Sequence, residues 1–162
     1  MVLPIDMTFT AYSKIVFATD YQPNDLQDLQ QVTKIARAFE CPLQVVHVVN
    51  RFEEDEDDLD LTMLDAFSDL IRKHVAYGKI KCEEYQYTDV PEGIQAYAEE
   101  EKADLLVVST RQRKFIQRLF GRSVTRELLF DFNLPLLVYH TPEKAETDAL
   151  PLQAMNFDLK FT

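Results

Sequence analysis

The sequence predicts a three-layer α/β/α sandwich built on a doubly wound parallel sheet. Three short apolar runs carry this prediction: residues 14–20, residues 104–110 and residues 134–140. Each run is almost uninterrupted rather than alternating in polarity, which is typical of strands that are covered on both faces by helices. Segments with helical spacing of apolar residues separate the strands, so strands and helices alternate along the chain. In such a sheet, ligands bind beyond the carboxyl ends of the strands, where the strand order reverses.

The first strand is predicted at residues 14–19. Asn24, followed three residues later by Gln27, resembles the start of a helix, and apolar residues at helical spacing continue the helix to Phe39. Residues 43–49 then form a second buried strand.

The middle of the chain gives one helix and one edge strand. The acidic stretch 51–58 is predicted to be a solvated loop, and residues 59–77 a helix that Gly78 ends in a left-handed conformation. Residues 79–88 alternate in polarity and carry lysines, which suits an exposed edge strand. The alternation changes phase at residues 83–84, and this change indicates a β-bulge.

The remaining elements complete the alternating pattern. Pro91 opens a short helix that runs to Lys102, and residues 104–109 form the fourth strand. A basic connection leads to a helix at residues 123–132, and residues 134–140 form the fifth strand.

Composition and charge exclude several classes of function. The chain has 162 residues, which suits one domain, and a net charge of −11, which disfavours partners that are polyanions, namely nucleic acid and anionic membranes. The sequence contains no run of 18 apolar residues, which is the length needed to span a bilayer, and we expect no secretory signal. Cys41 and Cys82 lack the spacing of metal ligands, so we expect buried free thiols in a reducing, cytoplasmic setting and no metal site.

Charge is distributed unevenly along the chain. Acidic residues crowd positions 53–60, whereas the stretch 111–126 holds six cations: Arg111, Arg113, Lys114, Arg118, Arg122 and Arg126. Three interpretations of the basic stretch stay open. It captures an anion through arginine side chains, it pairs with the acidic loop of a partner module, or it is a solvated face that holds apolar residues against the core.

Five segments, in their order and spacing, resemble the universal stress protein family over residues 13–141. They are residues 14–20 (Lys-Ile-Val-Phe-Ala-Thr-Asp), 45–49 (Val-Val-His-Val-Val), 103–109 (Ala-Asp-Leu-Leu-Val-Val-Ser), 123–128 (Ser-Val-Thr-Arg-Glu-Leu) and 133–139 (Asn-Leu-Pro-Leu-Leu-Val-Tyr). The resemblance implies an adenine nucleotide alpha hydrolase-like fold, a five-stranded parallel sheet of order 3-2-1-4-5, and dimerisation through the last strand.

The resemblance also implies a site for ATP, but the phosphate-binding pattern is altered in this chain. Family members hold the phosphates on a loop of pattern G-x-x-G-x(9)-G-[ST], where glycines let backbone N–H groups approach the anion. Here Ser109, Gln112 and Arg122 stand at the three glycine positions, and the hydroxyl position survives as Ser123. An arginine in the left-handed conformation costs about 1–2 kcal/mol. The pattern therefore predicts a degenerate phosphate site.

This chain matches the family better at the positions that contact adenosine than at those that bind the phosphates. The full set of nucleotide-binding positions that the resemblance gives is Ala18, Thr19, Asp20, Val48, Ser109, Gln112, Arg122, Ser123, Val124 and Thr125. Asp20 matches a nucleotide contact, and the backbone of Val48 matches an adenine contact. A structural interpretation stays open for Asp20, whose carboxylate is placed to accept hydrogen bonds from loop N–H groups. For Ser123, capping of the following helix is the simpler role.

The two ends of the chain lie outside the family resemblance. Residues 1–12 resemble a linker or the remnant of a preceding module, which suggests the second module of a tandem protein. Residues 142–162 end on alternating apolar residues, and we expect this tail to pack on the domain or on a partner.

Together, these features predict a non-catalytic regulatory module of the stress response. It would act as a homodimer or with a tandem sister module, with a degenerate nucleotide site and no required cofactor. The alternative is an adenine-nucleotide binder, for ATP or a related nucleotide, with an arginine-lined phosphate site. An enzyme is disfavoured because the sequence holds no nucleophile elbow of pattern G-x-S-x-G.

Overall fold

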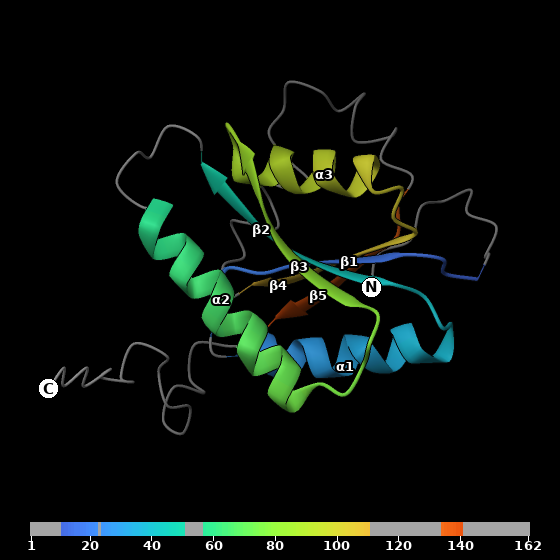
Figure 1. The fold of residues 1–162 in the computed structure, drawn as a ribbon. Coiled ribbons are helices and arrows are strands. Elements are labelled where there is room, and N and C mark those ends of the chain that lie inside the picture. Colours follow the sequence, from blue (N-terminus) through green and yellow to red (C-terminus); the bar gives the residue numbers. More distant parts are fainter. Residues whose placement is uncertain (1–10, 23, 51–56, 111–133, 141–162) are drawn as a thin grey trace, which may run out of the picture.

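The computed structural model describes residues 11–22, 24–50, 57–110 and 134–140, which form a parallel sheet with helices on both faces (Figure 1). The predicted fold class is confirmed. In chain order the elements are β1 (Ile15–Ala18), α1 (Asp25–Ala38), β2 (Leu43–Asn50), α2 (Asp57–His74), β3 (Ile80–Tyr87), α3 (Val90–Glu100), β4 (Leu105–Thr110) and β5 (Leu136–His140).

The strand order is β3-β2-β1-β4-β5, as predicted, and every neighbouring pair is parallel. β1 lies at the centre, with Ile15 opposite Leu43 of β2 and opposite Leu105 of β4. The chain first builds outward from β1 through β2 to β3, and then crosses back to β4. The strand order therefore reverses between β1 and β4, and their carboxyl ends are where a ligand is expected.

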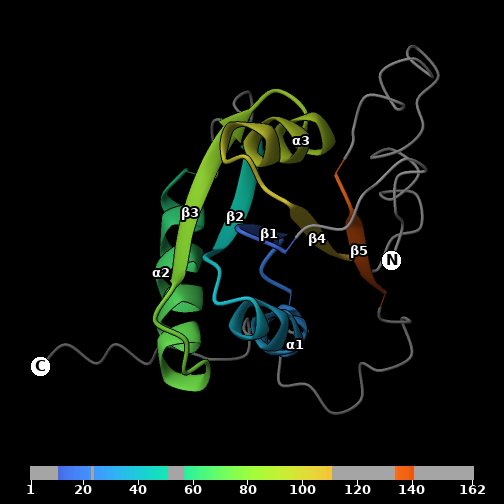
Figure 2. The ribbon, with the colours of Figure 1, turned by 90° about the vertical axis from the view of Figure 1, so that its right-hand side faces the viewer.

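The sheet separates two apolar cores. α1 and α2 cover one face and α3 covers the other (Figures 1 and 2). Side chains of β1 alternate between the cores: Phe17 packs with α1 and α2, whereas Val16 packs with α3. Both of these side chains have 0% exposure. Burial on both faces explains why the sequence of β1 is apolar without interruption.

The predicted bulge in β3 is wrong. The pairing of β3 with β2 is unbroken from Leu43↔Ile80 to Asn50↔Tyr87. The change of phase has another cause, because both faces of this strand are covered by helices. Cys82 packs on the side of α1 and α2, whereas Tyr85 packs on the side of α3, so apolar character moves from one face to the other without any slip in register.

The predicted end of the second helix is also wrong. α2 ends at His74 rather than at residue 77, and Gly78 does not adopt a positive φ. Beyond the helix, the Tyr77 hydroxyl donates to the carbonyl oxygens of Ala36 and Cys41, at 3.1 and 2.7 Å. α2 also begins within the stretch that was predicted to be a loop.

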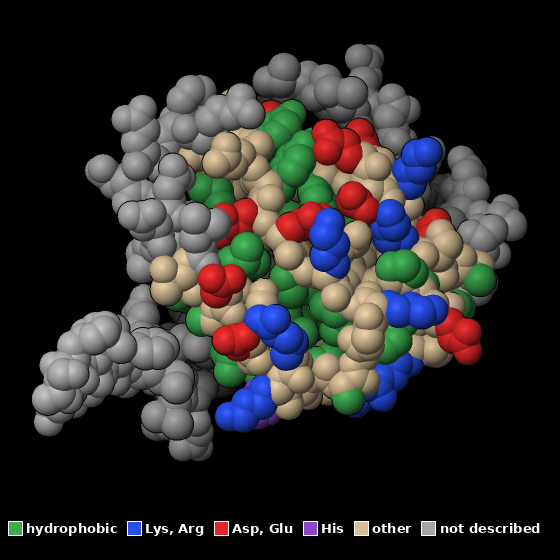
Figure 3. All heavy atoms as spheres, in the orientation of Figure 1, with side chains coloured by type: hydrophobic (Ala, Val, Ile, Leu, Met, Phe, Trp, Pro, Cys, Tyr) green, Lys and Arg blue, Asp and Glu red, His purple; other side chains and the backbone are tan. Residues whose placement is uncertain are grey.

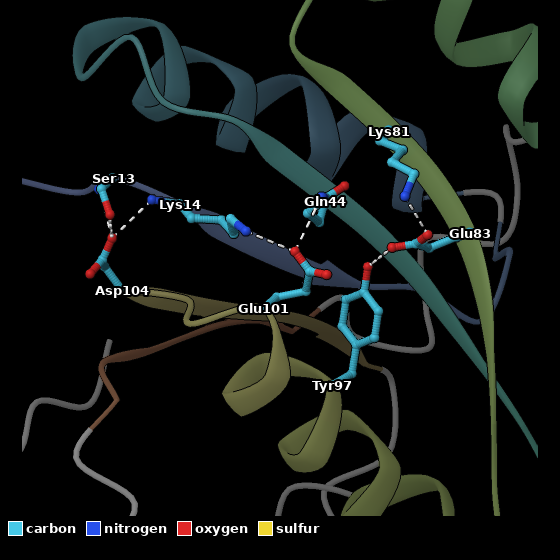
Figure 4. Close-up of polar contacts among 8 residues, drawn as sticks. All are labelled: Ser13, Lys14, Gln44, Lys81, Glu83, Tyr97, Glu101 and Asp104. Atoms are coloured by element: carbon cyan, nitrogen blue, oxygen red, sulfur yellow. Dashed lines mark hydrogen bonds and ion pairs between the residues drawn. The ribbon is translucent and has the colours of Figure 1, made fainter.

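At their amino ends the strands are joined by a polar network (Figure 4). One carboxylate oxygen of Asp104 accepts hydrogen bonds from the Ser13 N–H, the Ser13 hydroxyl and the Lys14 N–H, at 2.6, 2.5 and 2.9 Å. Nζ of Lys14 in turn lies 2.8 Å from Glu101. Asp104 therefore joins the start of β1 to the start of β4, at the end of the sheet opposite the candidate site.

No helix among the described residues is both long and apolar enough to cross a membrane. The helix predicted at residues 123–132 lies outside the described residues, as do the two terminal segments at 1–10 and 141–162.

Candidate functional site

The carboxyl end of β1 carries three of the predicted site residues. Ala18, the last residue of β1, lies opposite Val46 of β2 and Val108 of β4. Thr19 continues the strand by one residue, because its N–H donates to the Val46 carbonyl at 3.0 Å. Asp20 follows and is exposed. These residues therefore lie where the strand order reverses.

Val48, near the end of β2, is buried against α3. Its side chain is 5% exposed, and it lies beneath Gly93 of α3. A Cβ atom at Gly93 would lie 2.6 Å from Cγ1 of Val48 and 2.7 Å from Cβ of Tyr87. The Val48 side chain is thus used for packing against α3. The contact between its backbone and a ligand stays a prediction.

Ser109, near the end of β4, has a local structural role. Its hydroxyl donates to Oδ2 of Asp28 at 2.7 Å and so joins β4 to the first turns of α1. Five other predicted site residues lie outside the described residues: Gln112, Arg122, Ser123, Val124 and Thr125.

A buried carboxylate outside the predicted set of site residues organises the connection from β1 to α1. Asp25, the first residue of α1, is 1% exposed. Its Oδ2 accepts a hydrogen bond from the Thr19 hydroxyl at 2.5 Å, and from the N–H groups of Asp20 and Gln22 at 3.2 Å each. The connection thus folds around one carboxylate oxygen.

The predicted role of Asn24 in starting α1 is not confirmed. Asn24 is the N-cap residue, but its side chain makes no capping hydrogen bond. Asp25 instead accepts the N–H of Gln22, which precedes the helix. The side-chain acceptor therefore organises the connection rather than the first turn of the helix.

Burial changes the acidity of both α1 carboxylates. Burial raises the pKa of Asp25 from 3.8 to about 6, against the hydrogen bond from Thr19, and the negative charge of Asp20 adds to the rise. Burial also raises the pKa of Asp28, and the charge of Asp25 contributes to this rise. Acidic side chains from the connection and from α1 therefore meet at the reversal of strand order.

Tyr21 closes the connection on the side of α2. Its backbone is left-handed, with φ of 58°, and its ring is buried against the ring of His47, with centroids 4.3 Å apart, and against Phe67 at 5.5 Å. Nδ1 of His47 lies 2.8 Å from the Thr19 carbonyl oxygen, so Nδ1 carries the proton and donates. His47 therefore holds the connection in place from β2.

The sequence does contain a signal for the buried carboxylates. Asp25 and Asp28 stand four residues before Leu29 and Val32, which are both buried. Residues four apart share one face of a helix, so the buried stripe of α1 continues backward onto two acids. Extending the apolar stripe to its polar end would have identified them.

The described part of the chain offers no cluster of three or more His, Cys, Asp or Glu side chains that could hold a metal ion. At the strand ends, the described hydroxyl and N–H donors are bonded to the carboxylates of Asp25 and Asp28. These acidic side chains disfavour a highly charged anion.

Comparisons with known proteins identify the family. Residues 11–140 match the model of the Universal stress protein family. The chain is 28% identical over 149 residues to a universal stress protein of Methanocaldococcus jannaschii, and this match covers 82% of the chain and 85% of that protein.

Solved structures support the same fold. A universal stress protein in complex with cAMP is 23% identical, with a TM-score of 0.58, and the match covers 82% of this chain and 99% of that one. A universal stress protein of Archaeoglobus fulgidus in complex with dAMP is 22% identical, with a TM-score of 0.57, covering 80% and 98%. With the family model matching most of its length, the chain belongs to the universal stress protein family.

Proposed function

We propose that this protein is a non-catalytic regulatory module of the stress response, with a nucleotide site that has lost its triphosphate-binding part. The site keeps its adenosine-binding part at the ends of β1 and β2. The module acts by pairing with a second copy or with a sister module.

The observation that carries this proposal is the use of the polar donors at the strand ends. The hydroxyl of Thr19 and the N–H groups of Asp20 and Gln22 donate to Asp25, and the hydroxyl of Ser109 donates to Asp28. Oxygen atoms of a phosphate group need such donors. Because carboxylates already accept hydrogen bonds from these donors, fewer donors are available to a triphosphate. The negative charges of the carboxylates also repel it.

Two features support retention of the adenosine part. Ala18, Thr19 and Asp20 lie at the end of β1, beside the reversal of strand order, where α/β sheets bind ligands, and Val48 lies near the end of the adjacent β2. Family members of the same fold are known in complex with cAMP and dAMP, which carry a single phosphate group each. A ligand with one phosphate makes smaller demands on the altered loop than ATP does.

The character of the two sheet edges supports pairing through β5. The edge strand β3 carries Lys81, Glu83 and Glu84, and an ion pair of 2.7 Å joins the first two. Figure 3 shows this side of the molecule with basic and acidic side chains interspersed. β5 (Leu136–His140) has no lysine, acidic residue or proline. Charged residues protect an edge against further pairing, so β5 is the better edge for a second chain.

Isothermal titration with ATP, cAMP and adenosine, with and without magnesium, tests the proposal. We expect adenosine and cAMP to bind in a 1:1 ratio and ATP to give no saturable binding at micromolar concentration. Micromolar binding of ATP that saturates at one equivalent would contradict the loss of the triphosphate part.

A second candidate is an adenine-nucleotide binder whose phosphates are held by arginine side chains. The sequence favours it through the six cations between Arg111 and Arg126, since guanidinium groups suit phosphate geometry. In that case ATP binds, and both Arg122→Ala and Asp20→Ala abolish the binding. Under the first proposal Arg122→Ala leaves adenosine binding unchanged, so the same variant separates the two functions.

A further inference from the structure

We infer that Asp25 makes the site selective for adenine ligands of low negative charge and links their binding to pH. A cyclic adenine mononucleotide binds more tightly when Asp25 holds a proton, whereas neutral adenosine binds equally well in both states. This inference rests on the proposed function, in which the site keeps its adenosine-binding part.

The position of Asp25 gives it this influence. Its carboxylate is buried beneath the connection that carries Thr19 and Asp20, and it contacts the hydroxyl of one and the N–H of the other. The negative charge therefore lies one hydrogen bond away from two candidate ligand contacts. Because the carboxylate is shielded from water, its field on a neighbouring anion is screened less than that of a surface acid.

Within the described ranges, the groups that interact with Asp25 or flank it do not compensate for its charge. Asp20 in the connection and Asp28 on α1 are both acidic, and each interacts with Asp25. β5 contributes Tyr139, and burial raises the pKa of its phenol, with a further rise from the charge of Asp28. β2 contributes His47, whose Nδ1 donates to the Thr19 carbonyl rather than to a carboxylate.

A proton on Asp25 changes two properties of the site together. It removes one negative charge, and it weakens Asp25 as an acceptor for the N–H groups of Asp20 and Gln22. Those donors then become available to a ligand oxygen. The proton is exchanged near neutral pH, since burial raises the pKa of Asp25 to about 6.

The test compares cAMP with adenosine between about pH 7.5 and about pH 5.5 by isothermal titration. cAMP is the suitable probe because its phosphodiester keeps one negative charge throughout this range, whereas the second ionisation of a phosphomonoester falls near pH 6. We expect cAMP to bind about fivefold more tightly at the lower pH and the affinity for adenosine to stay constant.

Two variants assign the effect to the α1 carboxylates. Asp25→Asn should bind cAMP about fivefold more tightly at pH 7.5 and lose the pH dependence. If Asp25→Asn does not fold, Asp28→Asn replaces it, because Asp28 is only half-buried and its side chain accepts a hydrogen bond from Ser109. That variant should also tighten cAMP binding at pH 7.5 and leave adenosine unchanged.

Glu40→Gln is the matched control for net charge. Glu40 is exposed just beyond the far end of α1, about 20 Å from Asp25 along the helix. The Glu40→Gln substitution removes one negative charge at a position remote from the site, so it should leave the affinity for cAMP unchanged.

Three outcomes overturn the inference: the same pH response for adenosine and cAMP, an unchanged pH dependence in Asp25→Asn, or tighter cAMP binding in Glu40→Gln. The second outcome would assign the pH dependence to a group other than Asp25. Absence of adenosine and cAMP binding at both pH values is a different result, because it contradicts the proposed function itself.

Discussion

Asp25 is a buried acid that serves as the common acceptor of a short connection. A carboxylate accepts hydrogen bonds from several donors at once. This suits a tight connection whose N–H groups lie outside the backbone hydrogen bonding of a helix or strand. Its disadvantage is desolvation, since burial makes the charged form unfavourable in the folded protein. The connection is therefore well ordered at a cost in stability near neutral pH.

Replacing Asp25 with Asn should reveal that cost as a function of pH. The folded-state pKa of about 6 exceeds the ordinary 3.8, so between these values the folded protein holds a proton that the unfolded chain has lost. Relative to the variant, the wild-type free energy of unfolding should fall as pH rises from about 4 to about 6, by up to about 3 kcal/mol. Urea unfolding of both proteins across this range measures the difference.

The control for this experiment is Asp69→Asn on α2, where the carboxylate is 76% exposed. The difference between wild type and this variant should change little with pH. If the difference in free energy of unfolding between wild type and Asp25→Asn were also independent of pH, ionisation of Asp25 would not be costly in the folded state.

The individual site residues could be predicted only in part from the sequence. The place of Thr19 and Asp20 follows from where an apolar run ends, and the structure has them at the end of β1. The internal role of Ser109 could not be predicted, because it depends on Asp28, a residue 81 positions away. Chain spacing alone carries no information about such a long-range contact.

At the scale of elements, the contact of α3 with the sheet depends on the absence of one side chain. Gly93 lets the helix backbone approach Val48 of β2 and Tyr87 of β3 at its amino-terminal end. Asp89 starts this helix by accepting the N–H of Glu92 at 3.2 Å. The start of α3 and the ends of two strands are thus fixed relative to one another.

Gly93→Ala should destabilise the protein by about 1–2 kcal/mol. The new Cβ would lie at 2.6–2.7 Å from Val48 and Tyr87, and the contact with Cβ of Tyr87 cannot be relieved by rotating a side chain. The better helix propensity of alanine, about 1 kcal/mol, offsets only part of the overlap. Thermal or urea unfolding checks this result.

Gly78→Ala is the matched control, because nothing lies within 4 Å of the position that its Cβ would take and its φ is not positive. It should be neutral or slightly stabilising. Equal stability of the two alanine variants would mean that α3 can move away from the sheet without loss.

The elements show what apolar pattern can and cannot predict. The strands at β1 and β4 were predictable because burial on both faces leaves a continuous apolar run. In β3 the bulge predicted from a change of phase in the alternating pattern is wrong, because that change reflects a change in which face carries the apolar side chains. α2 ends at His74, and the Tyr77 hydroxyl that follows it contacts α1 and Cys41, which sequence spacing does not encode.

At the scale of the whole molecule, the sheet has two unlike edges. β3 carries charged side chains along its length, whereas β5 carries none within Leu136–Tyr139. A second chain is therefore expected to add to β5 rather than to β3. Pairing there would extend the sheet across two copies.

Amide hydrogen exchange at several protein concentrations tests this expectation. The amides of residues 136–140 should become more protected as concentration rises, while those of residues 80–87 should exchange at the same rate throughout. Concentration-dependent protection at β3, or at neither edge, would contradict pairing through β5.

The strand order also has a consequence for synthesis of the chain. β1, β2 and β3 lie within the first 87 residues, but β4, which completes the hydrogen bonding of β1, begins at residue 105. A chain that leaves the ribosome amino end first can assemble three strands while one side of its most apolar strand still lacks a neighbour. The nascent protein thus carries an unpaired edge on β1, where another chain can pair and aggregate. The rate of translation through residues 88–110 determines how long this edge of β1 remains unpaired.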